Sequence, residues 1–484
     1  MHEKAIINPG ENMKVDILFA IMAVQEVLFF APVAKRLRDE EGLKVAFLTF
    51  HEAGDDILEK EGVPYFSLHK IKNSEEMKRH VFLKPEDVQA RLGINIRKLI
   101  LHEMLTTNRL DEKYLSLKVM TYHAIMDSIF RGNDIGCVVQ ELGGFIAPQM
   151  LYHVSRYYRK QHIFIEPAMF PKRIVFTLND MNADIADYGK GVKASDEELK
   201  KLLEQYSTRK TVVIPKKDKH FFQDMSLKRL FSMDNFRRLS RKLYHKYILG
   251  REEEYNAILW YIVYHFIKFF KRKVLSFYYS EPVEGEKYIY YPFHVPLDVQ
   301  LTMRCPEFLN QEALVGYIAR VIPLGCRLYV KEHPAAIGGH QLSRMRDILR
   351  DKNIRLIHPR YNSFDLIKNA GCVITINSKV GFEAIMQGKP VVVLGSTFYR
   401  GKGVTVDVNN VSDISDAVTS AIGEAGSTAN RDYFLNKAFE WSYKGELYEN
   451  SPENVENFFR SLRTFMLKSG IIKADKYTAE GAVK

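Results

Sequence analysis

Short apolar stretches alternate with helix-like segments through the first 190 residues of the chain. The strands that this pattern predicts are VDILFA at 15–20, LKVAFLTF at 43–50, IGCVVQE at 135–141 and HIFIE at 162–166. Amphipathic segments separate them, including a charged helical stretch from about residue 73 to residue 130. Strands that alternate with helices form parallel sheets, so residues 13–190 are predicted to be a Rossmann-like domain.

The same rhythm returns at residue 286 and predicts a second Rossmann-like domain over 286–425, followed by C-terminal helices and a tail over 426–484. Its strands are expected in YIYYPFHV (288–295), CRLYVKEHP (326–334), IRLIHP (354–359), GCVITI (371–376) and PVVVL (390–394). Residues 191–285 are basic and aromatic without a strand rhythm. They open with a capping box at Ser195 and Glu198, which predicts a helical insertion or linker. The predicted fold class is α/β, with two doubly wound domains facing each other across a cleft.

The formal charge of +11 indicates an anionic partner, which is nucleic acid, an acidic membrane surface or a phosphate-bearing substrate. Zinc-type Cys/His spacing and nucleic-acid-binding signatures are missing from the sequence, so we expect no nucleic acid. The four cysteines are far apart and are expected to be reduced. The sequence shows no signal peptide and no apolar run of transmembrane length, so we expect a cytoplasmic protein, free or peripheral on the inner face of the membrane.

Two carboxylates close predicted strands of the first domain. Glu141 ends IGCVVQE and Glu166 ends HIFIE. Open α/β sheets bind ligands at the carboxyl ends of their strands, which makes both residues candidates for chemistry. The alternative is that both are solvated loop acids.

A basic residue and a histidine close a predicted strand of the second domain. Pro334 ends this strand and holds His333 in extended geometry, with Lys331 two residues earlier. His333 is therefore placed to donate to a phosphate oxygen, although a histidine at a strand end is often structural.

A second polar element follows the strand VITI. Asn377 and Ser378 stand at a predicted helix start, where free N–H groups and a hydroxyl suit a phosphate. Gly381 is expected to allow close approach of the ligand, and Glu383 to accept hydrogen bonds from ribose hydroxyls. Helix capping alone would explain Ser378, but not Glu383. The sequence has no DxD motif and no P-loop, so the site is expected to work without a metal, and we expect no cofactor.

Several blocks resemble the capsule polysaccharide biosynthesis proteins, a family that includes bacterial β-Kdo transferases of the GT-B fold. The matching blocks are IFIEPAMFP (163–171), NDMNA (179–183), YYPFHVPLDVQ (290–300), YVKEHP (329–334) and residues 363–399. The resemblance implies a glycosyltransferase in which His333, Asn377 and Ser378 contact the CMP of a CMP-activated acidic sugar such as Kdo. It also implies a lipid-linked or growing glycan as acceptor.

One departure from the family affects the catalytic assignment. Family members usually follow the glutamate with a second acid and a glycine, whereas Pro167 and Ala168 follow Glu166 here. A double-displacement route is therefore in doubt, and Glu166 is expected to act as general base or to stabilise an oxocarbenium-like transition state. Asp180 is the fallback acid. The donor-site pattern also resembles CDP-glycerol glycerophosphotransferases, and the missing acid keeps open a non-catalytic polysaccharide-assembly protein.

The segment 257–279 is apolar, aromatic and closed by cations, and two interpretations of it stay open. It is either a buried interdomain helix or a surface that enters the headgroup region of an anionic membrane.

Overall fold

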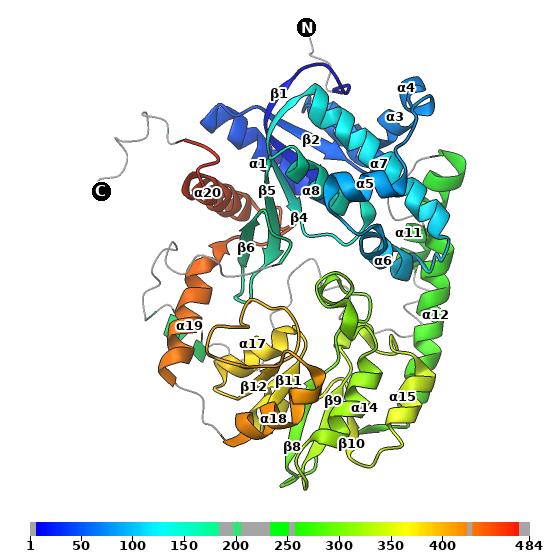
Figure 1. Cartoon of the computed structure of the whole chain (residues 1–484). Helices are drawn as coiled ribbons and strands as arrows, with labels where there is room; N and C mark the ends of the chain where they lie inside the picture. Colours follow the sequence, from blue (N-terminus) through cyan, green and yellow to red (C-terminus); the bar gives the residue numbers. More distant parts are fainter. Residues whose placement is uncertain are drawn as a thin grey trace.

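The computed structural model describes residues 6–182, 197, 199–201, 203–204, 233–250, 257–423 and 428–473. Two seven-stranded sheets organise these residues, one in the upper and one in the lower half of Figure 1. Each sheet has a hydrophobic core on either face. The alternation of side chains along a strand produces this, since Ile17 and Phe19 enter one core and Leu18 and Ala20 the other.

The first sheet has a doubly wound parallel centre, in the order β3-β2-β1-β4-β5, and an antiparallel edge. Its strands are β1 (Lys14–Ile21), β2 (Val45–Thr49), β3 (Tyr65–Ser67), β4 (Asp134–Glu141), β5 (Gln161–Pro167) and β6 (Arg173–Leu178). Its helices are α1 (Val24–Glu41), α2 (Glu52–Lys60), α3 (Leu68–Lys72), α4 (Glu75–Lys78), α5 (Pro85–Leu92), α6 (Ile96–Thr107), α7 (Glu112–Gly132) and α8 (Ile146–Tyr157).

The second sheet is parallel throughout, in the order β13-β12-β11-β8-β9-β10-β7. Its strands are β7 (Tyr279–Ser280), β8 (Tyr288–Pro292), β9 (Arg327–Lys331), β10 (Ile354–Ile357), β11 (Val373–Thr375), β12 (Val391–Val393) and β13 (Val406–Asp407). Its helical elements are α13 (Val299–Thr302), η3 (Pro306–Phe308), α14 (Gln311–Val321), η4 (Pro334–Ala336), α15 (Leu342–Ile348), α16 (Ser363–Asn369), α17 (Lys379–Met386), η5 (Val411–Asp413), α18 (Ile414–Gly423) and α19 (Thr428–Trp441).

The end of the chain returns to the first sheet. β14 (Tyr443–Lys444) pairs antiparallel with β6, and α20 (Pro452–Lys468) packs on α1. Phe458 of α20 lies edge-on to Phe29 of α1 with ring centroids 4.9 Å apart. The helices that close the molecule therefore tie the two domains together.

The insertion between the domains is mainly helical in its two longer described stretches. It contains α11 (Met233–Leu243), the π-helical turn η2 (Tyr244–Ile248) and α12 (Ile258–Leu275), which runs along the right edge of Figure 1. α12 is not buried: Leu259, Phe270 and Phe277 just beyond its end are 63%, 66% and 88% exposed. This excludes the buried-helix interpretation for its outer face. No helix in the described part of the chain combines the length and the apolarity that crossing a membrane requires.

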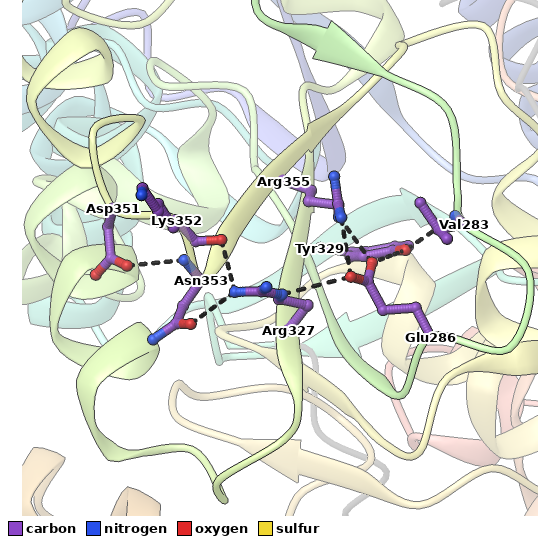
Figure 2. A network of polar contacts seen from close by, with 8 residues as sticks. All are labelled: Val283, Glu286, Arg327, Tyr329, Asp351, Lys352, Asn353 and Arg355. Atoms are coloured by element: carbon purple, nitrogen blue, oxygen red, sulfur yellow. Dashed lines mark hydrogen bonds and ion pairs between the residues drawn. The ribbon is translucent and has the colours of Figure 1, made fainter.

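A charged network lies at the end of the second sheet where its strands begin (Figure 2). Glu286 accepts hydrogen bonds from Arg355 at 2.7 and 2.9 Å and from Arg327, and these contacts, led by Arg355, lower the pKa of Glu286. Arg327 also donates to the Lys352 carbonyl and the Asn353 side chain, both at 2.8 Å. Since Arg327 opens β9, this network lies at the edge opposite to the carboxyl ends of the strands and is structural.

The predicted α/β fold class is confirmed, since both sheets are doubly wound. The short strands β3, β7, β13 and β14 and the antiparallel β6 were not predicted. The capping box predicted at Ser195 and Glu198 lies outside the described residues. The domain boundaries stay a prediction.

Candidate functional site

The candidate site lies at the switch point of the second sheet. β8 and β11 are neighbours, and the chain proceeds from β8 to β9 on one side and from β11 to β12 on the other. Loops therefore diverge at the carboxyl ends of β8 and β11, which is where doubly wound sheets bind ligands. His294 follows β8, His333 follows β9 and Asn377 follows β11.

His294 is buried at the centre of this site and was not predicted as a site residue from the sequence. Its Nε2 accepts a hydrogen bond from the Asn377 backbone N–H at 3.2 Å, and burial lowers the pKa of the ring to about 3. The ring is therefore neutral with its proton on Nδ1. Nδ1 has no partner among the described residues and is left with one hydrogen bond to donate.

Asn377 is oriented by the segment after β8. Its amide nitrogen donates to the Gln300 carbonyl at 2.6 Å and approaches Cys305 Sγ at 3.6 Å, while its buried Oδ1 has no partner among the described residues. An amide oxygen accepts hydrogen bonds. In this arrangement Asn377 offers a ligand an acceptor, which suits a hydroxyl or amino group better than a phosphate.

Ser378 is the N-cap of α17. Its Oγ accepts from the Val380 N–H at 3.2 Å, and its own N–H donates to Thr375 Oγ1 at 3.0 Å. Ser378 therefore caps α17, as the alternative interpretation expected. A contact between Ser378 and the donor stays a prediction.

Gly381 is required by packing. A Cβ at this position would lie 2.4 Å from Tyr399 Oη and 2.9 Å from Thr375 Cγ2, and Tyr399 Oη donates to the Ser378 carbonyl at 2.7 Å. The space beside Gly381 is therefore filled by Tyr399. Its predicted role in admitting the ligand gains no support from this geometry.

Glu383 and Lys331 are both buried beneath the switch point. Burial raises the pKa of Glu383 to about 7, while Lys379 and Lys331 act in the opposite direction. Burial likewise lowers the pKa of Lys331 to about 8, opposed by Glu383, and its Nζ donates to the Tyr361 carbonyl at 2.7 Å and to Ser363 Oγ at 2.6 Å. Glu383 Oε2 has no hydrogen-bond partner among the described residues.

His333 begins the loop after β9, and Pro334 opens the 3₁₀ turn η4. His333 Nδ1 accepts from the Ala335 N–H at 3.2 Å. Burial lowers the pKa of His333 to about 4, and Lys379, Lys331 and then Lys268 add to this effect. The neutral ring carries its proton on Nε2, within a positive field that those lysines supply.

Glu166 is held by an arginine of the other domain. Arg304 donates to both carboxylate oxygens, at 2.6 and 3.2 Å, with both side chains largely buried. Arg304 also donates to the Met181 carbonyl and to Gln300 Oε1 at 2.9 Å. Since Asn377 binds the Gln300 carbonyl, a continuous polar chain joins Glu166 in the first domain to Asn377 in the second.

A second contact between the domains lies beside this chain. His102 Nδ1 of α6 is 2.7 Å from Thr302 Oγ1 of α13, and the His102 ring leaves no room for a Cβ at Gly144. The segment 299–305 therefore contacts residues of the first domain as well as residues of its own domain.

The other two carboxylates are not part of this chain. Asp180 is exposed, and its Oδ1 accepts from the Asn182 N–H at 2.8 Å. Glu141 accepts a hydrogen bond from the Tyr448 hydroxyl, in the returning C-terminal segment. Within the described ranges, no three His, Cys, Asp or Glu side chains gather as a metal site would require.

A family model described as "Capsule polysaccharide biosynthesis protein" matches residues 194–439, just over half of the chain. Protein FixF of Sinorhizobium fredii is 30% identical over 162 residues, 32% of this chain and 37% of FixF. Capsule polysaccharide modification protein LipA of Neisseria meningitidis is 30% identical over 80 residues, 16% of this chain and 11% of LipA. The chain thus aligns with well under half of either relative.

Among solved structures, the chain is similar to Thermosulfurimonas dismutans KpsC, a beta Kdo 2,7 transferase. The TM-score is 0.35 and the identity 15%, over 71% of this chain and 89% of that chain.

Proposed function

Because the chain belongs to the capsule polysaccharide biosynthesis protein family, we propose that it is a glycosyltransferase of surface-polysaccharide synthesis. The proposed donor is a CMP-activated acidic sugar such as Kdo, and the proposed acceptor is a lipid-linked or growing glycan. The proposed location is the cytoplasm, at the inner face of the membrane where such an acceptor is assembled.

One observation carries the proposal. Three buried polar atoms without a partner among the described residues gather around the switch point of the second sheet: His294 Nδ1, Asn377 Oδ1 and Glu383 Oε2. An unsatisfied buried polar group costs about 1–3 kcal/mol. Three of them where doubly wound sheets bind nucleotides support a site that a polar ligand completes.

The proposed phosphate site needs no metal ion. His333 donates from Nε2 to a phosphate oxygen, and Lys379, Lys331 and Lys268 supply positive potential around it. Asn377 and Glu383 accept from hydroxyl or amino groups of the nucleoside. Charge on the departing CMP is then met by side chains of the protein.

In the transfer itself, the bond between the anomeric carbon and the phosphate oxygen breaks, and CMP leaves with the electron pair. The acceptor hydroxyl oxygen forms the new bond and gives up its proton. Glu166 is our proposed base, and Arg304 must first free one of the two carboxylate oxygens that it holds. Asp180 and Glu141 are the alternatives if Glu166 is dispensable.

The Arg304 clamp also favours a second candidate, a non-catalytic polysaccharide-assembly protein. A carboxylate with both oxygens held by a guanidinium stabilises the contact between domains whether or not chemistry occurs. Release of CMP on mixing the protein with donor and acceptor separates the two candidates.

Thermal stabilisation by nucleotides tests the donor assignment. CMP and CDP should stabilise the protein, by about 2.7 kcal/mol at a hundredfold excess over Kd, and UDP and GDP should not. His333→Ala should weaken this effect, because a phosphate contact already exists in the ground state. A clear preference for UDP or GDP would overturn the donor assignment.

A further inference from the structure

The outer face of α12 is a continuous apolar stripe. Its members are Leu259, Val263, Phe266, Ile267, Phe270, Val274 and, just past the helix end, Phe277, all of them exposed. At 3.6 residues per turn, these positions fall within an arc of about 100°. Contiguous exposed apolar side chains of this kind mark a surface that contacts another phase or molecule.

The inner face of α12 is fixed to the loop that follows His333. Lys268 Nζ donates to the Ala335 carbonyl at 3.3 Å, and Lys271 Nζ donates to the His340 carbonyl at 3.0 Å. A Cβ at Gly338 would lie 2.4 Å from the Lys268 carbonyl oxygen, so the helix and loop are in direct backbone contact. The direction of the stripe is therefore set, and it points away from the donor loop.

α11 and η2 add a second exposed surface with the same chemistry. Its exposed apolar residues are Met233, Phe236, Tyr244, Tyr247, Ile248 and Leu249, and its exposed cations are Arg237, Arg238, Arg241 and Lys242. Arg238 lies near enough to Tyr261 of α12 to act on the pKa of that phenol, which burial raises. The two surfaces are thus neighbours.

The described part of this surface is mainly cationic. Residues 233–250 contain five lysines and arginines and one acidic residue, Asp234, and α12 adds Arg272 and Lys273 beyond the two lysines of its inner face. A second copy of the same surface would be repelled, and a nucleic-acid backbone offers no apolar phase for seven side chains. Anionic headgroups above an acyl layer satisfy both the cations and the stripe.

We infer that α12, α11 and η2 form the surface on which this protein binds an anionic lipid bilayer. α12 lies in the plane of the interface with its stripe in the headgroup and upper acyl region, and the α11 cations face lipid phosphates. Because the inner face of α12 contacts the loop after His333, the candidate donor site then lies close to the membrane surface. The inference specifies the partner surface of the proposed function, but does not depend on which nucleotide is bound.

Co-sedimentation of the purified full chain with vesicles tests this. The protein should bind phosphatidylcholine vesicles that contain phosphatidylglycerol, bind those of phosphatidylcholine alone weakly, and be released in part by salt. The quadruple variant Arg237→Gln, Arg238→Gln, Arg241→Gln, Lys242→Gln should lose more than about a hundredfold in partitioning, at about fivefold per charge. Its melting temperature should be unchanged, because the four side chains are exposed.

A matched variant removes the same charge elsewhere. Lys35→Gln, Lys60→Gln, Lys98→Gln and Lys113→Gln alter four exposed lysines of the first domain and should leave most of the binding intact. Equal losses in the two quadruple variants would mean that net charge alone drives binding and would overturn the assigned surface. So would binding of the α11 variant at the wild-type level.

The apolar stripe is tested separately. Leu259→Gln, Phe270→Gln and Phe277→Gln should abolish the fraction of binding that salt does not release, while stabilisation by CMP is kept. If purified protein fails to bind anionic vesicles and is captured only through another protein, the lipid assignment is wrong. Because CMP stabilisation is measured on the same samples, failure of the lipid surface and failure of the donor assignment are told apart.

Discussion

Replacing Glu383 by glutamine should make the ligand-free protein more stable at neutral and alkaline pH, although it removes a residue that we place in the donor site. The carboxylate is buried and one of its oxygens lacks a partner among the described residues. Keeping such a group charged opposes folding, and glutamine has nearly the same shape without the charge.

The magnitude follows from the proton affinity of the folded protein. Burial raises the pKa of Glu383 from an ordinary value of 4.5 to about 7. The folded state therefore binds the proton more tightly than the unfolded state, and the stability gained from protonation is lost as the pH rises from 4.5 through 7. Deprotonation of Glu383 therefore lowers the free energy of unfolding by about 3 kcal/mol at pH 8. At pH 5 the folded protein is mostly protonated at this site, and the loss is less than about 1 kcal/mol.

Urea unfolding of wild type and Glu383→Gln at pH 5 and pH 8, without ligand, measures this difference. The variant should gain little at pH 5 and on the order of 3 kcal/mol at pH 8, with an unchanged m value. Glu284→Gln, which removes an exposed carboxylate, should show no such pH dependence. An equal gain in the free energy of unfolding at both pH values, or a loss that grows with pH, would show that the folded protein already stabilises the charged form of Glu383. The same variant should lose most stabilisation by CMP, as expected where function requires a destabilising group.

Three further changes test the contacts around the site. Glu166→Gln should lower kcat with donor affinity nearly kept, measured by CMP release, because a base acts only as the bond forms. Arg304→Gln should cost about 3 kcal/mol in urea unfolding by leaving the largely buried Glu166 carboxylate unpaired, and adding Glu166→Gln should recover part of that loss. Gly381→Ala should cost about 1–3 kcal/mol, since its Cβ meets the Tyr399 hydroxyl, whereas Gly423→Ala has open space and should be nearly neutral.

Periodicity predicted the central strands because each is buried on both faces and stands between helices. The strands it missed are short edge pairings such as β7, β13 and β14, two residues each, whose sequences carry no alternation of their own. β6 follows β5 after a short turn and runs antiparallel to it, against the parallel rhythm on which the prediction rested.

Lys331 shows how far strand geometry predicts the surroundings of a residue, whereas its donor-binding role stays a prediction. Lys331 and Tyr329 are two residues apart on β9 and therefore share a face of the sheet, and Tyr329 is a core residue. A lysine on a core face requires polar partners, and the Tyr361 carbonyl and the Ser363 hydroxyl meet that need. The sequence contained this argument, since Tyr329 belongs to the apolar run that ends at Lys331.

His294 and Arg304 were missed for different reasons. His294 was included in a strand predicted over 288–295, but β8 ends at Pro292, which places His294 in the loop at the switch point. Arg304 left no local signal, because its partner Glu166 is 138 residues away and belongs to the other sheet. Its role depends on how the domains meet, which no pattern along the chain encodes.

The segment from Gln300 to Arg304 links the two halves of the candidate site. At one end Asn377 binds the Gln300 carbonyl, and at the other end Arg304 holds Glu166 and the Met181 carbonyl. Leu301 within this segment and Cys305 just after it are buried in the core of the second domain, so the segment moves with the second sheet. Separating the sheets must therefore break the Arg304 contacts to Glu166 and to the Met181 carbonyl, which leaves a largely buried carboxylate unpaired. The ion pair between Arg304 and Glu166 thus opposes the opening of the candidate site, whichever ligand the donor loops bind.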